Sequence, residues 1–410
     1  MVPVFHNNHN LTLAHFFVVR GAFFPYSRTP SSSSFLRSDM RYNLLKSRIP
    51  AARRQAVAAR LVQLGQQLDE AIPSKDTDRN LLLATWNIRD FGKRNNRGYG
   101  TRLPESLFYI AEILSRFDFI AVQEVNELYD LEKVADILGE NWDFIATDVT
   151  DVKLGGNGER LTYLFDKRKV CFQNIAGEIV LPNDMLVSKA LVAGEDETQL
   201  YAGKQFRRTP FAAKFQAGWF RFEICTVHLY YGAESGTKLD ERVEEISRIA
   251  QYFGKRSAEA EKEFRSLILL GDFNIVSPEH ETMKALSDEG FRIPPGLAPS
   301  NVAGGKYYDQ IAFKARSGVL EYVAAGGKSG SGVFETFENV FTPSQFEEYK
   351  VDVARSSNGK SKTTDAALKA YYSDDWRTYQ LSDHKPMWVR LQSNDSPRYL
   401  QSIVTGERNW

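Results

Sequence analysis

The sequence predicts an α/β protein in which layers of β-sheet are covered by helices. Three observations lead to this prediction: apolar strand-like runs recur from residue 80 onward, amphipathic helical patterns lie between them, and several runs are rich in β-branched or aromatic residues. The chain has 410 residues, of which 42% are hydrophobic. It is therefore long and apolar enough to bury a sizeable core.

The expected strands are short apolar runs. They are LLLAT (81–85), FIAV (119–122), LTYLF (161–165), FAAKF (211–215), WFRFEICTV (219–227) and LILL (267–270). A helix is expected around residues 103–116, and a longer one before Gly254. The apolar stripe of the longer helix consists of Leu239, Val243, Ile246, Ala250 and Phe253.

The N-terminal part of the chain divides at Met40. Residues 1–39 are expected to be a leader or a disordered extension, because residues 1–38 contain no Asp or Glu and end near a serine run. The alternative is that Met40 is the functional start. Residues 40–79 are expected to hold an amphipathic helix, whose apolar positions are Val57, Leu61, Leu64 and Leu68.

The remainder is expected to form one main domain over residues 80–393 and a C-terminal tail over residues 394–410. Within the domain, residues from about 317 to 380 are expected to be an insertion. Two Gly/Ser/Lys stretches, AAGGKSGSG (324–332) and SSNGKSK (356–362), predict mobile loops there.

Charge and cysteine content limit the class of protein. The 52 Lys and Arg residues balance 52 Asp and Glu residues, which excludes a globally basic polymer binder but permits a local basic patch. Cys171 and Cys225 can form at most one bridge, which favours a reducing, cytoplasmic location. The composition of residues 1–38 leaves export or organelle targeting open. We expect no membrane span, because no apolar run reaches about 18 residues.

Five polar segments end or follow apolar runs. They are TWNIRDFG (85–92), AVQEV (121–125), TVHLYYG (226–232), LLGDFN (269–274) and LSDHKP (381–386). Each alone is commonly a turn or cap, but the ordered set is hard to produce by turn chemistry. Their oxygen ligands suit Mg²⁺ or Mn²⁺ better than structural zinc. His228 and His384 are suited to proton transfer near neutral pH.

The motifs WNIRDFG, QEV, GDFN and SDHKP, in this order, resemble the blocks of the endonuclease/exonuclease/phosphatase superfamily, and most closely deoxyribonuclease I-like nucleases. ERLTYLF (159–165) and RRTPFAAKF (207–215) resemble its intervening strands. The resemblance runs over about residues 81–391. It implies a four-layered α/β sandwich, with two central, mostly antiparallel sheets flanked by helices and a site at one edge of the paired sheets.

The resemblance also implies a role for each motif residue. Glu124 would be a metal ligand, helped by Asn87 and Asp383. Asp272 and Asn274 would position the attacking water and the scissile phosphate.

Two histidine–carboxylate pairs follow from the same resemblance. Asp309, in YYDQI, would orient His384 on the water side, and Glu159 would orient His228 on the leaving-group side. A carboxylate on one imidazole nitrogen fixes the tautomer and raises the basicity of the other nitrogen. Arg208, in RTP, would hold a phosphate oxygen.

The chain departs from deoxyribonuclease I at two positions that enter the minor groove of duplex DNA, where it has Asn126 and Asn157. We therefore expect a preference for flexible or single-stranded nucleic acid. Residues 89–102 form a basic, glycine-rich stretch that is expected to hold flanking phosphates while Tyr99 stacks on a base. Its cations are Arg89, Lys93, Arg94, Arg97 and Arg102. The alternative is a solvated, flexible loop.

The expected function is hydrolysis of a phosphate ester that depends on Mg²⁺ or Mn²⁺, with nucleic acid as the first substrate class. A phosphomonoesterase or a phospholipid phosphodiesterase of the same fold is the second reading. A catalytically inactive binding module is the third, and it is disfavoured because none of the matched positions is replaced.

Overall fold

The computed structural model describes residues 40–76, 78–93, 97–149, 158–193, 199–296, 298–315, 322–324 and 327–406. The expected leader (1–39), Arg94 and Asn157 lie outside the described residues. The division of the chain at residues 80 and 393 stays a prediction.

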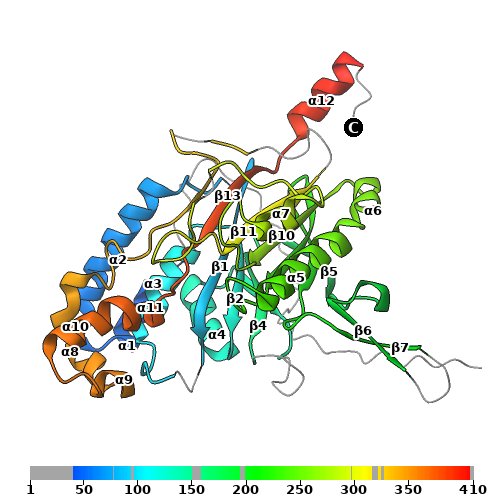
Figure 1. The fold of residues 1–410 in the computed structure, drawn as a ribbon. Helices are drawn as coiled ribbons and strands as arrows, with labels where there is room; N and C mark the ends of the chain where they lie inside the picture. The colour runs from blue at the N-terminus through cyan, green and yellow to red at the C-terminus, as the bar shows by residue number, and fades with distance from the viewer. Residues whose placement is uncertain are drawn as a thin grey trace, which may run out of the picture.

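Two sheets form the centre of the molecule. The first has the order β12 (Ser331–Val333), β13 (Met387–Gln392), β1 (Asn80–Phe91), β2 (Phe119–Val125), β4 (Arg160–Asp166) and β3 (Trp142–Ala146). The second has the order β11 (Asp309–Lys314), β10 (Arg265–Asp272), β9 (Phe220–His228), β8 (Phe211–Ala217) and β5 (Cys171–Glu178). A hairpin of β6 (Ser188–Ala193) and β7 (Gln199–Lys204) projects from one side (Figure 1).

Each sheet contains one parallel pair of strands. β1 runs parallel to β2, and β9 runs parallel to β10, whereas the other described pairings are antiparallel. The carboxyl ends of the four parallel strands carry the polar segments of the sequence. The topology therefore decides which of those segments meet.

The central strands are buried on both faces, which explains why they read as continuous apolar runs. In β1, Leu81 and Leu83 join the core between the two sheets, while Leu82 and Ala84 join the core beneath one helical layer. Aromatic rings dominate the core between the sheets; the Phe119 and Phe215 rings, for example, lie 4.8 Å apart at 74°. Because successive side chains of a strand point to opposite faces, alternate residues of β1 contribute to two different cores.

Helices cover the outer face of each sheet (Figure 1). The first sheet is covered by α1 (Leu45–Arg48), α2 (Ala51–Ala71), α3 (Pro104–Leu114) and α4 (Leu128–Leu138). The second is covered by α5 (Thr237–Gly254), α6 (Ser257–Lys262) and α7 (Glu281–Ser287). The predicted four-layered α/β sandwich is confirmed, and so is the N-terminal amphipathic helix, which forms as α2.

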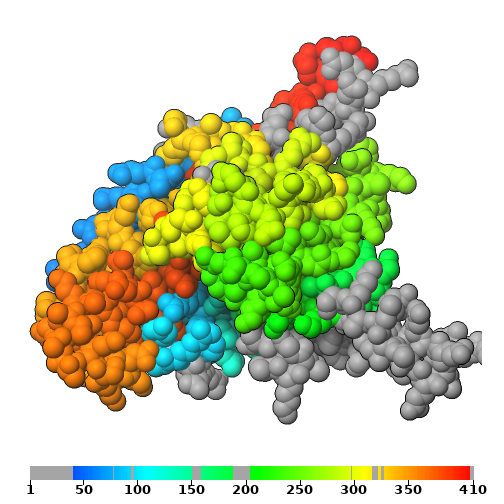
Figure 2. All heavy atoms as spheres, viewed as in Figure 1, coloured from blue at the N-terminus to red at the C-terminus, as the bar shows by residue number. Residues whose placement is uncertain are grey.

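Further helices extend the layer of α2 and α3. They are α8 (Phe346–Arg355), α9 (Ser357–Lys360), α10 (Asp365–Tyr371), the π-helical turn η5 (Tyr372–Trp376) and α11 (Arg377–Gln380), after the 3₁₀ turn η4 (Pro343–Gln345). We call residues 343–380 the helical insertion. In Figure 2 its orange surface borders the cyan surface of residues that follow β1.

The expectation of a mobile loop at residues 356–362 is wrong, because this stretch contains α9. Ser356 caps the helix by accepting a hydrogen bond from the Gly359 N–H at 3.0 Å. Gly359 packs so close to the Val353 carbonyl that a Cβ would not fit. A glycine and a serine that suggest flexibility in the sequence instead make this turn compact.

The tail contains α12 (Ser396–Thr405), which projects from the sandwich (Figure 1). Among the described helices, none combines the length and the apolar character needed to cross a membrane. Cys171 is exposed and Cys225 is buried, and both are free thiols. The cytoplasmic location stays a prediction.

Candidate active site

Strand register brings three of the predicted residues into one row. Asp272 is the last residue of β10, and it pairs with His228 at the end of β9 and with Asp309 at the start of β11. Since β9 and β10 are parallel and β11 is antiparallel, all three lie at the same edge of the sheet. His384 comes from the segment before β13, and Glu159 from the residue before β4.

Glu124 is aimed into the site by irregular strand ends. The pairing of β1 with β2 shifts between Asn87 and Phe91, and Glu124 has a φ of +60°. A non-glycine residue in this region is uncommon and often occurs at functional sites. The Asp90 N–H donates to Glu124 Oε2 at 2.7 Å, and Asn87 Nδ2 donates to Oε1 at 3.2 Å. These bonds hold the carboxylate in place.

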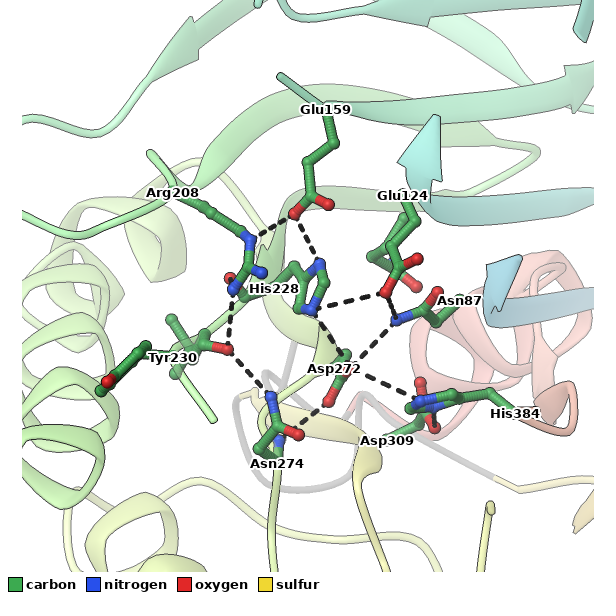
Figure 3. A network of polar contacts seen from close by, with 12 residues as sticks. Asn87, Glu124, Glu159, Arg208, His228, Tyr230, Asp272, Asn274, Asp309 and His384 are labelled. Atoms are coloured by element: carbon green, nitrogen blue, oxygen red, sulfur yellow. Dashed lines mark hydrogen bonds and ion pairs between the residues drawn. The ribbon is translucent and has the colours of Figure 1, made fainter. Parts of the chain in front are cut away.

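Asp272 lies at the centre of the site (Figure 3). Its Oδ2 accepts a hydrogen bond from Asn87 Nδ2 at 3.0 Å, and the same oxygen lies 3.5 Å from His228 Nε2 and 3.8 Å from His384 Nε2. Burial alone would raise the pKa of Asp272, but the two histidines and two hydrogen bonds lower it overall. Asp272 is therefore a carboxylate shared by both imidazoles.

His384 is held by Asp309, as the sequence predicts. Its Nδ1 lies 2.7 Å from Asp309 Oδ2, and its backbone N–H donates to Ser382 Oγ at 3.0 Å. Burial lowers the pKa of His384, but the carboxylates of Asp309 and Asp272 outweigh it, so the pKa lies well above its ordinary value. The Nε2 atom faces the centre of the site.

His228 forms the second pair. Its Nδ1 lies 2.6 Å from Glu159 Oε1, and Arg208 Nε pairs with the same carboxylate. Burial and the Arg208 charge lower the pKa of His228, but Glu159 and Asp272 raise it overall. Arg208 also donates to the Leu229 carbonyl at 3.2 Å. Its contacts in the structure are thus with Glu159 and the backbone.

Asn274 is fixed from two directions. Its N–H donates to Asp272 Oδ1 at 2.9 Å, and its side-chain Nδ2 donates to the Leu229 carbonyl at 2.9 Å. Its φ is +54°. The buried Arg242 donates to the Asn274 carbonyl at 2.7 Å. The turn after β10 is consequently rigid.

The oxygen donors fit a hard divalent cation. Glu124 and Asp272 supply carboxylates, and the buried Asn87 Oδ1 has no hydrogen-bond partner among the described residues. An unpaired buried amide oxygen beside two carboxylates suits Mg²⁺ or Mn²⁺. The described structure also groups Glu124 with Glu159 and His228, and Asp272 with Asp309 and His384, as sets of side chains spaced closely enough for a metal.

Asp383 lies at the margin of this arrangement. Its carboxylate is 47% exposed and lies 3.7 Å from Arg89 Nε. It is nevertheless close enough to affect Glu124. Burial raises the pKa of Glu124, and the charges of Glu159 and Asp383 raise it further, while His228 opposes them.

Arg102 differs most from its predicted phosphate-binding role. Its guanidinium donates to the backbone carbonyls of Arg89 and Gln380, at 2.7 and 3.2 Å, and packs 5.1 Å from the Phe91 ring and 5.0 Å from the Tyr379 ring. Burial lowers its pKa. In the structure Arg102 thus ties the segment after β1 to α11, and its phosphate-binding role stays a prediction.

The other described cations of the segment, Arg89, Lys93 and Arg97, also have protein partners. Asp90 pairs with Lys93 Nζ at 2.7 Å and with Arg97 Nε at 3.6 Å. Arg89 donates to Tyr99 OH at 2.9 Å and to Thr378 Oγ1 at 2.5 Å. Their phosphate-binding roles stay predictions.

Tyr99 is not an open stacking platform. Its ring stacks on Tyr379 at 5.3 Å and lies 6.2 Å from Tyr371, with the Arg89 guanidinium 4.8 Å away. Its neighbour Gly98 accepts a hydrogen bond from the Asn358 N–H of α9 at 3.0 Å. The segment is thus built onto the helical insertion.

Sequence reasoning missed several residues of this edge. Asp90 supports Glu124 and neutralises two cations, although it lies inside WNIRDFG. Tyr231 lies three residues after His228, inside TVHLYYG, and Tyr308 directly precedes Asp309, inside YYDQI. Each of these residues lies within or close to a motif that was recognised. Its charge or aromatic ring was the feature in the sequence that could have identified it.

The chain resembles one curated protein over about half of its length. No family model matches the chain. The chain is 27% identical over 218 residues to a protein named deoxyribonuclease from Thioalkalivibrio sp. (strain K90mix), an alignment that covers 51% of this chain and 51% of that relative. The chain thus spans about half the length of the curated relative that it matches.

Solved structures of similar outline include an endonuclease/exonuclease/phosphatase family protein from Bacteroides thetaiotaomicron, with 20% identity, a TM-score of 0.44 and coverage of 77% of this chain and 98% of that one. A mannosyl-6-phosphatase from Bacteroides thetaiotaomicron VPI-5482 has 18% identity, a TM-score of 0.45 and coverage of 76% and 99%.

The sandwich brings the polar segments that the sequence analysis singled out to one edge of the paired sheets. The predicted resemblance to deoxyribonucleases is confirmed by the similarity to the relative from Thioalkalivibrio, which extends over about half of each chain.

Proposed function

We propose that this chain is a divalent-metal-dependent phosphoester hydrolase, and specifically a deoxyribonuclease I-like endonuclease or phosphodiesterase that acts on nucleic acid. One observation carries the proposal: two histidine–carboxylate pairs face the single oxygen Asp272 Oδ2, beside the carboxylate of Glu124. Hydrolysis of a phosphate ester requires one proton acceptor, one proton donor and positive charge at the phosphate.

In this proposal Glu124 and Asn87 hold Mg²⁺ or Mn²⁺, with Asp383 nearby. The bound ion supplies positive charge that stabilises the negative charge developing on the phosphoryl oxygens. Asp272 and Asn274 position the attacking water and the phosphate.

The two imidazoles divide the proton transfers. His384, fixed by Asp309, accepts a proton from the attacking water at Nε2. His228, fixed by Glu159, donates a proton from Nε2 to the leaving oxygen. Arg208 holds the Glu159 carboxylate through an ion pair. In this proposal it also binds a phosphate oxygen of the substrate.

The relative named deoxyribonuclease favours nucleic acid as the substrate. A second candidate, a hydrolase of small phosphoesters, is favoured by a different observation: Lys93 and Arg97 pair with Asp90 instead of facing solvent unpaired. A surface that binds a nucleic-acid backbone needs Lys and Arg side chains that are free to contact its phosphates.

One screen separates these candidates. The purified chain is assayed with Mg²⁺ or Mn²⁺ against single-stranded DNA, duplex DNA, RNA, a generic phosphodiester and a phosphomonoester, with Asp272→Asn as the matched inactive control. We expect cleavage of single-stranded nucleic acid that stops in excess EDTA. Hydrolysis that persists undiminished in EDTA contradicts metal dependence, and turnover of the monoester alone contradicts the nuclease assignment.

A further inference from the structure

An exposed aromatic ring lies beside the candidate active site. Tyr231 is three residues beyond His228, and 41% of its surface is exposed. Its ring packs against the Arg242 guanidinium at 4.8 Å and against the Tyr308 ring at 6.1 Å and 87°. Its hydroxyl donates to Glu234 Oε1 at 3.3 Å. The ring is therefore held in one orientation while much of it faces solvent.

The groups that hold Tyr231 are themselves part of the site's framework. Arg242 is fully buried and donates to the Asn274 carbonyl at 2.7 Å. Tyr308 directly precedes Asp309, and its ring lies 5.5 Å from the His384 imidazole. Two ring contacts thus connect Tyr231 with His384. The position of the exposed ring is fixed relative to the reacting groups.

The proposed hydrolysis gives Tyr231 no role, because neither metal binding nor proton transfer requires it. A fixed tyrosine offers a large, rigid, apolar surface at low entropic cost. Stacking of a base on such a ring tolerates any base, since every base has a π-face. Tyr230, the adjacent residue, is only partly exposed, and the Arg207 guanidinium lies over its ring at 3.8 Å.

We propose that Tyr231 is a specificity-determining residue that stacks on a nucleobase next to the scissile phosphate, with Arg242 and Tyr308 as positioning residues. This inference rests on the proposed function and narrows its substrate to phosphodiesters that carry a base beside the cleaved bond. It also assigns base stacking to the segment after β9 of the second sheet, whereas Tyr99 follows β1 of the first sheet.

The test is a double-mutant cycle between the tyrosine and the base. Single-stranded DNA oligonucleotides are prepared in which one nucleotide at a time is replaced by a base-free tetrahydrofuran residue. Cleavage at each bond is measured with wild type, Tyr231→Ala and Tyr231→Phe. Trp219→Ala is the matched control, because Trp219 is 48% exposed but lies before the start of β9, at the opposite end of that strand from His228.

We expect Tyr231→Ala to lower kcat/KM for the intact oligonucleotide roughly tenfold or more. Removing one base next to the cleaved bond should lower kcat/KM of wild type by a similar factor. The same removal should leave kcat/KM of Tyr231→Ala almost unchanged. Trp219→Ala should behave as wild type, whereas Tyr231→Phe, which keeps the ring but loses the bond to Glu234, should still lose rate when the adjacent base is removed.

Three results overturn the inference. The first is an equal loss for Tyr231→Ala on intact and base-free substrates, which assigns the ring a structural role. The second is unchanged activity of Tyr231→Ala. The third is an unchanged wild-type rate on every base-free oligonucleotide, which leaves the ring no base on which to stack. If wild type cleaves no oligonucleotide at all, the proposed nuclease function fails first, and the inference fails with it.

Discussion

Asp309 Oδ2 lies 2.7 Å from Nδ1 of His384, in a pair that is almost completely shielded from solvent. The contact decides the chemistry of the imidazole, because it commits Nδ1 and leaves Nε2 to face Asp272. The same arrangement recurs at His228 with Glu159. Two imidazoles with fixed tautomers therefore meet across one carboxylate oxygen.

Asp309→Asn should lower kcat by roughly 10²-fold, since it leaves the shape of the pair but removes the charge that supports His384. KM should change little, because Asp309 is buried behind the imidazole. Steady-state kinetics with a thermal melt of each variant measures this. Activity within a few-fold of wild type in a folded variant contradicts the orienting role.

His228→Ala and His384→Ala should each reduce kcat by roughly 10²-fold or more. Both act on one chemical step, so the double variant should lose less than the product of the two single losses. Single-turnover rates of the four proteins complete the cycle. Fully multiplicative losses show instead that the two histidines act in independent steps.

Glu124→Gln should shift the Mg²⁺ concentration that gives half-maximal activity strongly upward, because it removes one ligand charge at nearly constant shape. Calorimetric titration with Mn²⁺ gives an independent measurement of the metal affinity. Glu127→Gln, three residues further along the chain, is the control. Equal metal dependence of both variants contradicts the assignment of Glu124 as a ligand.

Asp272 and His228 could be predicted to lie close together because each ends a strand whose apolar run is easy to recognise. β1, β2, β9 and β10 are buried on both faces, so their runs and their polar ends are sharp in the sequence. The edge strand β5 was missed because most of its residues are exposed or half-buried. A strand without a buried face leaves no apolar pattern.

The role of the basic segment could not be predicted, because a charge count does not reveal partners. Lys93 and Arg97 looked available in the sequence, but Asp90 pairs with both. Arg102 donates to the backbone carbonyl of Gln380 in α11, nearly 280 residues away. Such long-range pairing depends on where the helical insertion packs, and no local pattern encodes that position.

Arg102→Ala should destabilise the fold, because it leaves buried carbonyls without donors and removes packing between two aromatic rings. We expect a loss of about 2 kcal/mol or more in the free energy of unfolding. Arg97→Ala, a mostly exposed cation of the same segment, is the control and should cost less than about 0.5 kcal/mol. Chemical denaturation measures both. A raised KM with unchanged stability for Arg102→Ala would restore its predicted phosphate role.

The contact between α2 and α8 predicts a pH-dependent contribution to stability. Arg60 Nη1 donates to Glu348 Oε1 at 2.8 Å, and this bond lowers the pKa of Glu348 below its ordinary value of 4.5. A carboxyl whose folded pKa is depressed stabilises the protein above its unfolded pKa, and the contribution is lost as the pH falls through the folded pKa. Glu348 is partly exposed, so we expect only about 1 kcal/mol at pH 7.

Glu348→Gln should therefore melt about 2 °C below wild type at pH 7, and the difference should shrink as the pH falls below 4.5. Glu347→Gln is the control, because that side chain is 77% exposed on the same helix and should leave the melting temperature nearly unchanged. Calorimetric scans of the three proteins between pH 3 and pH 7 measure the effect. A difference that stays constant over this range contradicts the ionic origin, because a loss of packing alone would not depend on the protonation of Glu348.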